Sequence, residues 1–80
     1  SKGIDMNHGI TDSNEKDSEM KQAIFDSAET KILVIDSSKF DKISLIKVTD
    51  ITDVDIIATE KEPSSDWVEY LKRKNVDLIY

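Results

Sequence analysis

Cysteine is absent from this 80-residue sequence, which has only one histidine, one proline and two glycines. Without cysteine the chain can form no disulfide, no thiolate nucleophile and no cysteine-ligated zinc site. The only histidine, His8, has no second partner for a metal site or a histidine-based catalytic triad, so we interpret it as a loop residue. We therefore expect no metal site and no catalysis by a thiol or a histidine triad, and we expect no cofactor.

Long apolar runs are also missing, since the longest, Ile32 to Ile35, has four residues. Such a run is too short for a membrane span or for the core of a signal peptide. Nothing else marks the chain as secreted, so a reducing cytoplasm is the expected location.

Basic residues are outnumbered, with 11 lysines and arginines against 17 aspartates and glutamates and a net charge of -6. This charge repels phosphate backbones and acidic membranes, so the segment itself is expected to bind neither. With 38% hydrophobic and 35% charged side chains, residues 1–80 are expected to form a single small domain with a thin core.

The apolar pattern predicts an α/β fold. Ile32 to Ile35 is a continuous, mostly β-branched run of the kind found in strands covered on both faces, as in a parallel sheet, and residues 55–59 repeat it. Pro63 to Asp66 carry the proline, cap and acidic signals of a helix start, and Asn75 is suited to end that helix. The predicted fold is a layered, mostly parallel, Rossmann-like sheet with flanking helices. The expected elements are a helix from residue 13 or 14 to about 28, a strand at 32–35, a short strand or a turn plus strand at 43–48, a strand at 55–59, a helix from 63 to 75 and a strand at 76–80.

This element order lacks a beginning. The chain is expected to start with a loop and a helix, whereas a doubly covered parallel strand follows an earlier strand through a crossover. The sequence therefore looks like the second half of a domain.

Four segments carry a resemblance to a known family. They are Gly3 to Thr11 (GIDMNHGIT), Glu19 to Ile24 (EMKQAI), Asp36 to Phe40 (DSSKF) and Asp55 to Thr59 (DIIAT). In this order and at these spacings they resemble the C-terminal effector-sensing domain of the DeoR family of bacterial transcription regulators, over essentially all 80 residues. The most specific element is DSSKF, about fifteen residues after the acid-apolar-lysine triplet that begins at Glu19.

The resemblance implies a fold related to ribose-5-phosphate isomerase and CoA transferases, without their catalysis, that senses a phosphorylated sugar. It also implies an N-terminal winged helix-turn-helix, so operator DNA would be a partner only through that missing domain, and a homo-oligomer is expected. The front half of the sensor, with its threonine-rich phosphate loop and Gly-Gly turn, is missing as well. Lys2 departs from the pattern, since the family often has an acid or a small polar residue there.

Asp36, Ser37, Ser38 and Lys39 are the main candidates for binding the sugar phosphate. They follow the end of a predicted strand, and ligands of open α/β sheets bind beyond the carboxyl ends of the strands. A carboxylate there can accept hydrogen bonds from sugar hydroxyls, while serine hydroxyls, backbone amides and the lysine suit a phosphate. The alternative is an ordinary turn of the kind that Asp and Ser favour, with a solvated lysine.

Lys21, Gly9 and Thr11 are the further candidates. Lys21 lies in the predicted first helix, where it either meets an anionic ligand or pairs with Asp17 four residues earlier. Gly9 permits close backbone approach and Thr11 can donate a hydrogen bond, although both also suit a structural turn in the loop before that helix.

Two other patterns are interpreted as structural. The acidic run from Asp50 to Asp55 lacks the central glycine and final glutamate of a calcium loop and alternates with apolar residues, as a strand edge does. Trp67 and Tyr70 are expected in the core and at its rim, with a role of Trp67 in an oligomer contact as the alternative.

The leading hypothesis is a sensing module that is not an enzyme. The rival is a sugar-phosphate isomerase-like enzyme fragment, in which an acid and a lysine move a proton next to a carbonyl. The absence of a clear carboxylate pair around the DSSK turn counts against it. A third reading is a scaffold whose ligand is held by the missing half. In each case the fragment is expected to self-associate through an exposed sheet edge.

Overall fold

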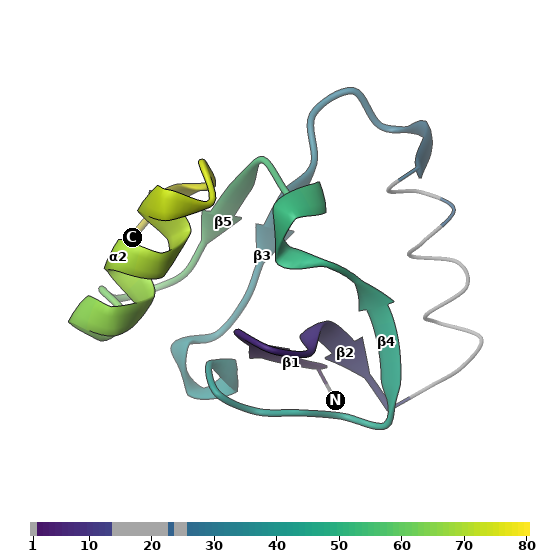
Figure 1. Ribbon diagram of the computed structural model, residues 1–80, viewed down its shortest axis with the longest axis horizontal. Helices are drawn as coiled ribbons and strands as arrows, with labels where there is room; N and C mark the ends of the chain where they lie inside the picture. Colours follow the sequence, from purple (N-terminus) through teal and green to yellow (C-terminus); the bar gives the residue numbers. More distant parts are fainter. Residues whose placement is uncertain (1, 14–22, 24–25) are drawn as a thin grey trace.

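The computed structural model describes residues 2–13, 23 and 26–80 (Figure 1). Most of the helix predicted between residue 13 or 14 and Ala28, and with it the candidate Lys21, lies outside the described residues. The described elements form two three-stranded sheets, one antiparallel and one parallel, with the helix α2. The chain is thus an α/β protein, but the prediction of one mostly parallel layered sheet is wrong.

The parallel sheet follows the sequence pattern closely. Hydrogen bonds from Ile35 N to Ala58 O (3.0 Å) and from Thr59 N to Ile79 O (2.9 Å) continue its ladders past the ends of the strands. Three predicted strands are therefore confirmed, and they run parallel as expected. In spatial order they are β3 (Ile32–Val34), β5 (Ile56–Ala58) and β6 (Asp77–Ile79).

The antiparallel sheet corrects the expectation that the chain starts with a loop. Its first two strands form a hairpin, in which Asp5 Oδ2 accepts hydrogen bonds from the backbone N–H groups of Asn7 (2.9 Å) and His8 (3.0 Å). This carboxylate stabilises the turn, as aspartate side chains do when they bond the backbone just after them. In spatial order the strands are β1 (Lys2–Asp5), β2 (Gly9–Asp12) and β4 (Ile46–Thr49).

Glycine is required where the hairpin packs most closely. Gly9 has φ 74°, and a Cβ there would lie 2.6 Å from the carbonyl oxygen of Thr49 on β4. A Cβ at Gly3 on β1 would collide with the backbone carbonyl of Lys42. The two glycines therefore let neighbouring backbone approach the hairpin. For Gly9, which the sequence analysis considered either as a structural turn residue or as a ligand contact, this is a structural role.

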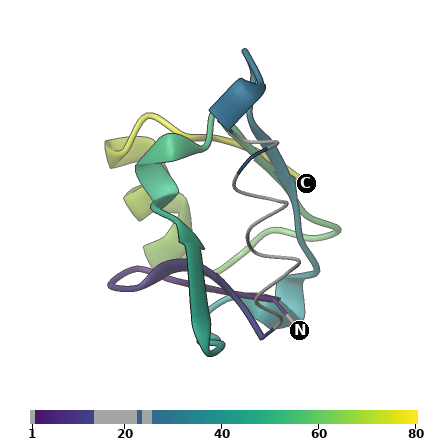
Figure 2. The same cartoon turned by 90° about the vertical axis from the view of Figure 1, so that its right-hand side faces the viewer.

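One hydrophobic core joins both sheets and α2. Trp67 is its largest fully buried side chain and meets the rings of Phe40 and Tyr70 edge to face, with centroids 5.0 and 5.6 Å away. The prediction that Trp67 and Tyr70 occupy the core and its rim is confirmed. Figures 1 and 2 show β3 and β4 well apart, so the core fills the space between the sheets. Its buried members are Ile4, Ile10, Leu33, Ile35, Val48, Ile51, Val54, Ile57, Trp67, Leu71 and Val76.

The helix α2 (Ser65–Arg73) has the ends that its sequence predicts. The Ser64 hydroxyl caps it by accepting a hydrogen bond from Trp67 N (3.4 Å). Just beyond it, Asn75 adopts a left-handed conformation with φ 59°, which directs the chain into β6.

Among the described residues, one face of the parallel sheet carries exposed apolar side chains, contrary to expectation. Leu33 and Ile35 are buried, but Ile32 and Val34 between them are 54% and 72% exposed, and Ile79 on β6 is 56% exposed. The run of apolar residues predicted cover on both faces, and the structure leaves this face exposed. A face of this kind suits contact with another polypeptide.

Residues 43–48 form a bend followed by a strand, which agrees with the predicted turn plus strand. Ile43 and Leu45 are exposed, and β4 begins at Ile46. The segment expected as a strand edge instead contains a 3-10 turn, η2 (Ile51–Asp53), because Ile51 and Val54 are both buried while the polar residues between them are exposed.

Candidate functional site

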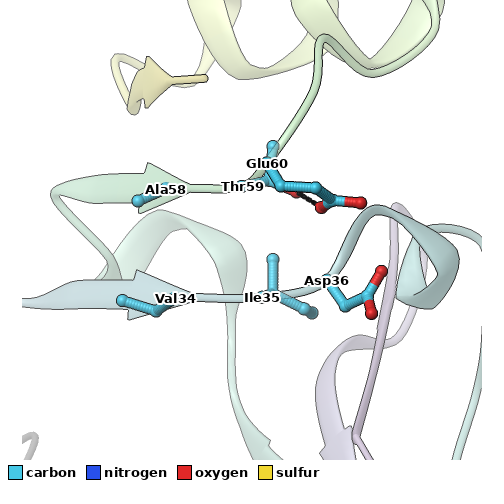
Figure 3. Close-up of a pocket in the computed structure, with 6 residues that line it drawn as sticks. All are labelled: Val34, Ile35, Asp36, Ala58, Thr59 and Glu60. Atoms are coloured by element: carbon cyan, nitrogen blue, oxygen red, sulfur yellow. Dashed lines mark hydrogen bonds between the residues drawn. The ribbon is translucent and has the colours of Figure 1, made fainter.

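The site lies where two parallel strands end side by side. β3 and β5 are hydrogen-bonded neighbours, so the residues after Val34 and after Ala58 meet at one edge of the sheet. Figure 3 shows the carboxyl groups of Asp36 and Glu60 extending past these strand ends on the same side. The candidate Asp36 to Lys39 segment is therefore at the carboxyl edge of the sheet, as predicted.

The segment after β3 is a tight turn, as its local chemistry predicts. Asp36 Oδ1 accepts a hydrogen bond from Ser38 N (3.0 Å), and Lys39 N donates to the Asp36 carbonyl (2.9 Å). These bonds form the 3-10 turn η1 (Ser37–Lys39). The turn then attaches to β1, because Asp41 N donates to the Ile4 carbonyl (2.8 Å).

Glu60 is the residue of this site that the sequence analysis missed. Its carboxylate accepts hydrogen bonds from Ser37 N (Oε1, 2.7 Å) and from Ser37 Oγ (Oε2, 2.6 Å), and a third from Thr59 Oγ1 (3.0 Å). These bonds, those from Ser37 above all, lower the pKa of Glu60 to about 2 although the side chain is exposed. The parallel register of β3 and β5 was the available signal, since it brings the residue after Thr59 to the start of the DSSK turn.

A cleft of about 440 Å³ opens between the two strand ends. Two carboxylates, those of Asp36 and Glu60, border it. The sequence-based statement that no carboxylate pair surrounds the DSSK turn is therefore wrong. The lining residues are Val34, Ile35, Asp36, Ala58, Thr59 and Glu60.

Ser38 and Lys39 keep their side-chain donors available. In the part of the chain that the structure describes, neither the Ser38 hydroxyl nor the Lys39 ammonium has a side-chain hydrogen bond or salt bridge. Ser37 differs, because both its amide and its hydroxyl are bonded to Glu60.

Gly9 and Thr11 lie on β2, in the other sheet. The buried Thr11 hydroxyl accepts a hydrogen bond from Ser44 N (2.8 Å) and donates to Gly3 O (3.4 Å). Thr11 also lines a second cleft of about 270 Å³ together with Ile32 and Val34. Val34 borders both clefts, so the two adjoin on the open face of β3.

The other polar patterns have local partners. His8 is in the hairpin turn as predicted, and the hydrogen bond between its ring and the Asp5 carboxylate (2.9 Å) lowers the pKa of Asp5. In the acidic run, Asp50 pairs with Lys47, and Asp53 Oδ2 accepts from the Thr49 hydroxyl (2.8 Å).

Within residues 2–13, 23 and 26–80, no three histidine or acidic side chains converge to hold a metal ion. No helix in the same ranges combines the length and apolar character needed to cross a membrane.

Comparison with known proteins matches residues 1–61 to the DeoR C terminal sensor domain. The chain is 32% identical to the L-fucose operon activator of Haemophilus influenzae over 77 residues, 96% of this chain and 31% of that protein. It is 27% identical to the deoxyribose operon repressor of Escherichia coli K12, over 98% of this chain and 31% of the repressor. It is 29% identical to the glycerol-3-phosphate regulon repressor of Haemophilus influenzae, over 95% of this chain and 29% of the repressor. The chain thus spans less than a third of the length of these curated relatives.

Proposed function

This chain belongs to the DeoR C-terminal sensor domain family, and on that basis we propose that it is the second half of a sensor domain that binds a phosphorylated sugar. Relatives over nearly its whole length are transcription regulators named for operons of L-fucose and deoxyribose and for a glycerol-3-phosphate regulon. These names support a small effector that carries several hydroxyls. One of the names also contains a phosphate compound.

The observation that carries the proposal is the position of the DSSK turn beside Glu60 at the carboxyl edge of the parallel sheet. Ligands of open α/β sheets bind there because the loops that follow the strands converge at that edge. The adjoining cleft of about 440 Å³ is of a size that fits a small metabolite.

The residues divide into two chemical roles. The Asp36 carboxylate accepts hydrogen bonds from the hydroxyls of the sugar, and charge makes such bonds stronger than neutral ones. The Ser38 hydroxyl and the Lys39 ammonium contact phosphate oxygens. Thr11, in the adjoining cleft, along with Gly9 and Lys21, stays a candidate for the far end of the effector.

In the whole regulator, the effector would act on DNA binding through the arrangement of subunits. We infer that a helix-turn-helix outside these 80 residues contacts the operator in a homo-oligomer. The sugar phosphate changes operator affinity only if it binds one arrangement of that oligomer more tightly than another.

Catalysis of the isomerase type is the weaker proposal despite the carboxylate pair. A general base works best when its pKa is near the working pH, whereas the Ser37 hydrogen bonds hold the pKa of Glu60 at about 2. Both carboxylates also hold the turn together through backbone amides. The relatives are named as an operon activator and an operon repressor, which also favours a regulator over an enzyme.

A two-dimensional amide NMR titration of the 80-residue chain tests the proposed function. The ligands are ribose 5-phosphate, deoxyribose 5-phosphate and glycerol 3-phosphate, each compared with its unphosphorylated counterpart. We expect shifts at residues 36–40 and at Thr59 and Glu60 with the phosphorylated compounds alone. A well-dispersed spectrum that no compound changes would favour the scaffold reading.

A further inference from the structure

Two donors at the start of the DSSK turn, the Ser37 amide and the Ser37 hydroxyl, are already occupied. The Glu60 carboxylate receives the Ser37 amide on one oxygen at 2.7 Å and the Ser37 hydroxyl on the other at 2.6 Å. A two-point contact of this kind is the one that a phosphate group makes with an amide and a hydroxyl. The Glu60 carboxylate thus occupies the position in which an anionic group of a ligand would accept hydrogen bonds from Ser37.

An arriving phosphate cannot share this position with Glu60. Two negative charges a few ångströms apart repel each other, and the Ser37 donors cannot serve both. Because the pKa of Glu60 is held at about 2, this residue stays charged at every pH at which the protein would work. Protonation therefore cannot free the Ser37 donors, and only movement of the side chain can.

We propose that Glu60 occupies the anion position of this site in the unliganded chain, and that the phosphate of the effector reaches Ser37 only by displacing the Glu60 carboxylate. This inference rests on the proposed function and adds a determinant of effector affinity to it. Glu60 is fully exposed and lies just past the end of β5, so its side chain can rotate away without disturbing the core.

The physical consequence is a lower apparent affinity. If the Ser37 donors are free in only a fraction of the molecules, the measured dissociation constant equals the intrinsic one divided by that fraction. A variant without the Glu60 carboxylate should therefore bind phosphate-bearing compounds more tightly than the wild type.

The test measures binding of ribose 5-phosphate, ribose and inorganic phosphate to four forms of the 80-residue chain: wild type, Glu60→Ala, Glu60→Gln and Glu62→Gln. Glu62→Gln is the matched control, because it removes the same charge from an exposed residue two positions away. The Glu62 carboxylate accepts a hydrogen bond from the Tyr80 hydroxyl (2.9 Å) and none from the turn. Before any ligand is added, the Ser37 amide resonance should move in both Glu60 variants and stay in place in the control.

We expect both Glu60 variants to bind ribose 5-phosphate and inorganic phosphate about tenfold more tightly than the wild type, which corresponds to a free fraction of about one tenth. Glu62→Gln should differ from the wild type by less than about twofold, since an exposed charge outside the turn is screened. If all three variants bind the phosphate compounds more tightly by the same factor, the gain in affinity comes from the change in net charge alone, and the inference is overturned.

Three further outcomes separate this inference from the proposed function. If the wild type binds ribose 5-phosphate but the Glu60 variants bind it no more tightly, the displacement is wrong and the sensor function stands. Weaker binding in these variants makes Glu60 a direct contact of the ligand, again against displacement. If no form binds any phosphate compound, both the displacement and the proposed site are wrong.

Discussion

In the antiparallel sheet the polar side chains Thr11, Asp12 and Thr49 are buried, whereas in the parallel sheet the polar groups gather beyond the strand ends and face solvent. The buried hydroxyls join neighbouring segments, as Thr49 does by donating to Asp53 (2.8 Å). At the parallel edge, the same kinds of residue surround a cleft. Residue type alone does not tell a buried hydroxyl that joins neighbouring segments from an exposed one beside a cleft, because its place in the sheet decides which it is.

The largest effect should come from breaking the core that the two sheets share. Trp67→Ala should lower the free energy of unfolding by about 3 to 5 kcal/mol, since it leaves a large cavity beside Phe40 and Tyr70. That is much of the stability of a domain this small, about 5 kcal/mol or a little more. Urea unfolding, followed through amide resonances of β2 and β5, should show both sheets unfolding together.

Tyr70→Phe is the control for this variant, because it removes only the hydrogen bond from the Tyr70 hydroxyl to the Met6 carbonyl (3.1 Å). It should lower the free energy of unfolding by about 0.5 to 1.5 kcal/mol. If β5 stays folded in Trp67→Ala after β2 has melted, the two sheets are independent units.

A smaller effect should follow from altering the antiparallel sheet alone. Gly9→Ala places a Cβ close to the Thr49 carbonyl at φ 74°, so we expect a loss of about 1 to 3 kcal/mol. Asn75→Gly also changes a residue of positive φ, and should change stability by less than about 1 kcal/mol because glycine accepts that conformation. Chemical denaturation measures both, and equal stabilities would show that the hairpin tolerates a side chain at residue 9.

The open face of the parallel sheet should govern self-association more than stability. Val34→Lys introduces a charge on the exposed face of β3, and should shift the chain toward the monomer in sedimentation velocity experiments while changing the free energy of unfolding by about 0.5 kcal/mol or less. Leu45→Lys adds the same charge at a residue that is 89% exposed and outside the sheet. Equal effects of the two variants, or a wild type that is strictly monomeric, would rule out association through β3.

The smallest effect concerns pH at the parallel edge. The folded-state pKa of Glu60 is below its ordinary value, so the contribution of its hydrogen bonds is complete above the unfolded-state value and is lost as pH falls toward 2. The Ser37 amide shift should therefore stay constant down to about pH 3.5 and change with a midpoint near 2. Glu60→Gln should abolish this transition, and a midpoint near 4.5 would mean that Ser37 does not hold the carboxylate.

The parallel sheet and α2 were predictable because their signals are local. Ile32 to Ile35 and residues 55–59 are apolar runs between polar ends, and Ser64 and Asn75 are ordinary helix-end residues. The hairpin was not predicted, because its strands have four residues each and its turn depends on the Asp5 carboxylate bonding the backbone after it. Strand pairing of this kind depends on contacts that hydrophobic periodicity does not encode.

The location of the candidate site was predicted only in part, because only some of its signals are local in the sequence. The Asp36 to Lys39 turn could be placed at a strand end from the sequence, and the resemblance to the DeoR family indicated its role. Glu60 was missed, because its partner Ser37 is 23 residues away along the chain, and only the register of the two parallel strands brings the two residues together. The exposure of Val34 likewise depends on what covers the sheet, which composition does not reveal.

Trp67 gives the chain an optical reporter of its own. It is the only tryptophan in the sequence, and its indole N–H donates to Asp41 Oδ1 (3.0 Å), two residues after the end of the DSSK turn. Its ring also contacts that of Phe40, the residue directly after that turn. A rearrangement that carries Phe40 and Asp41 with it would change the surroundings of the indole. The tryptophan fluorescence of the unlabelled protein, excited where tyrosine does not absorb, should therefore follow occupation of the turn from one known position.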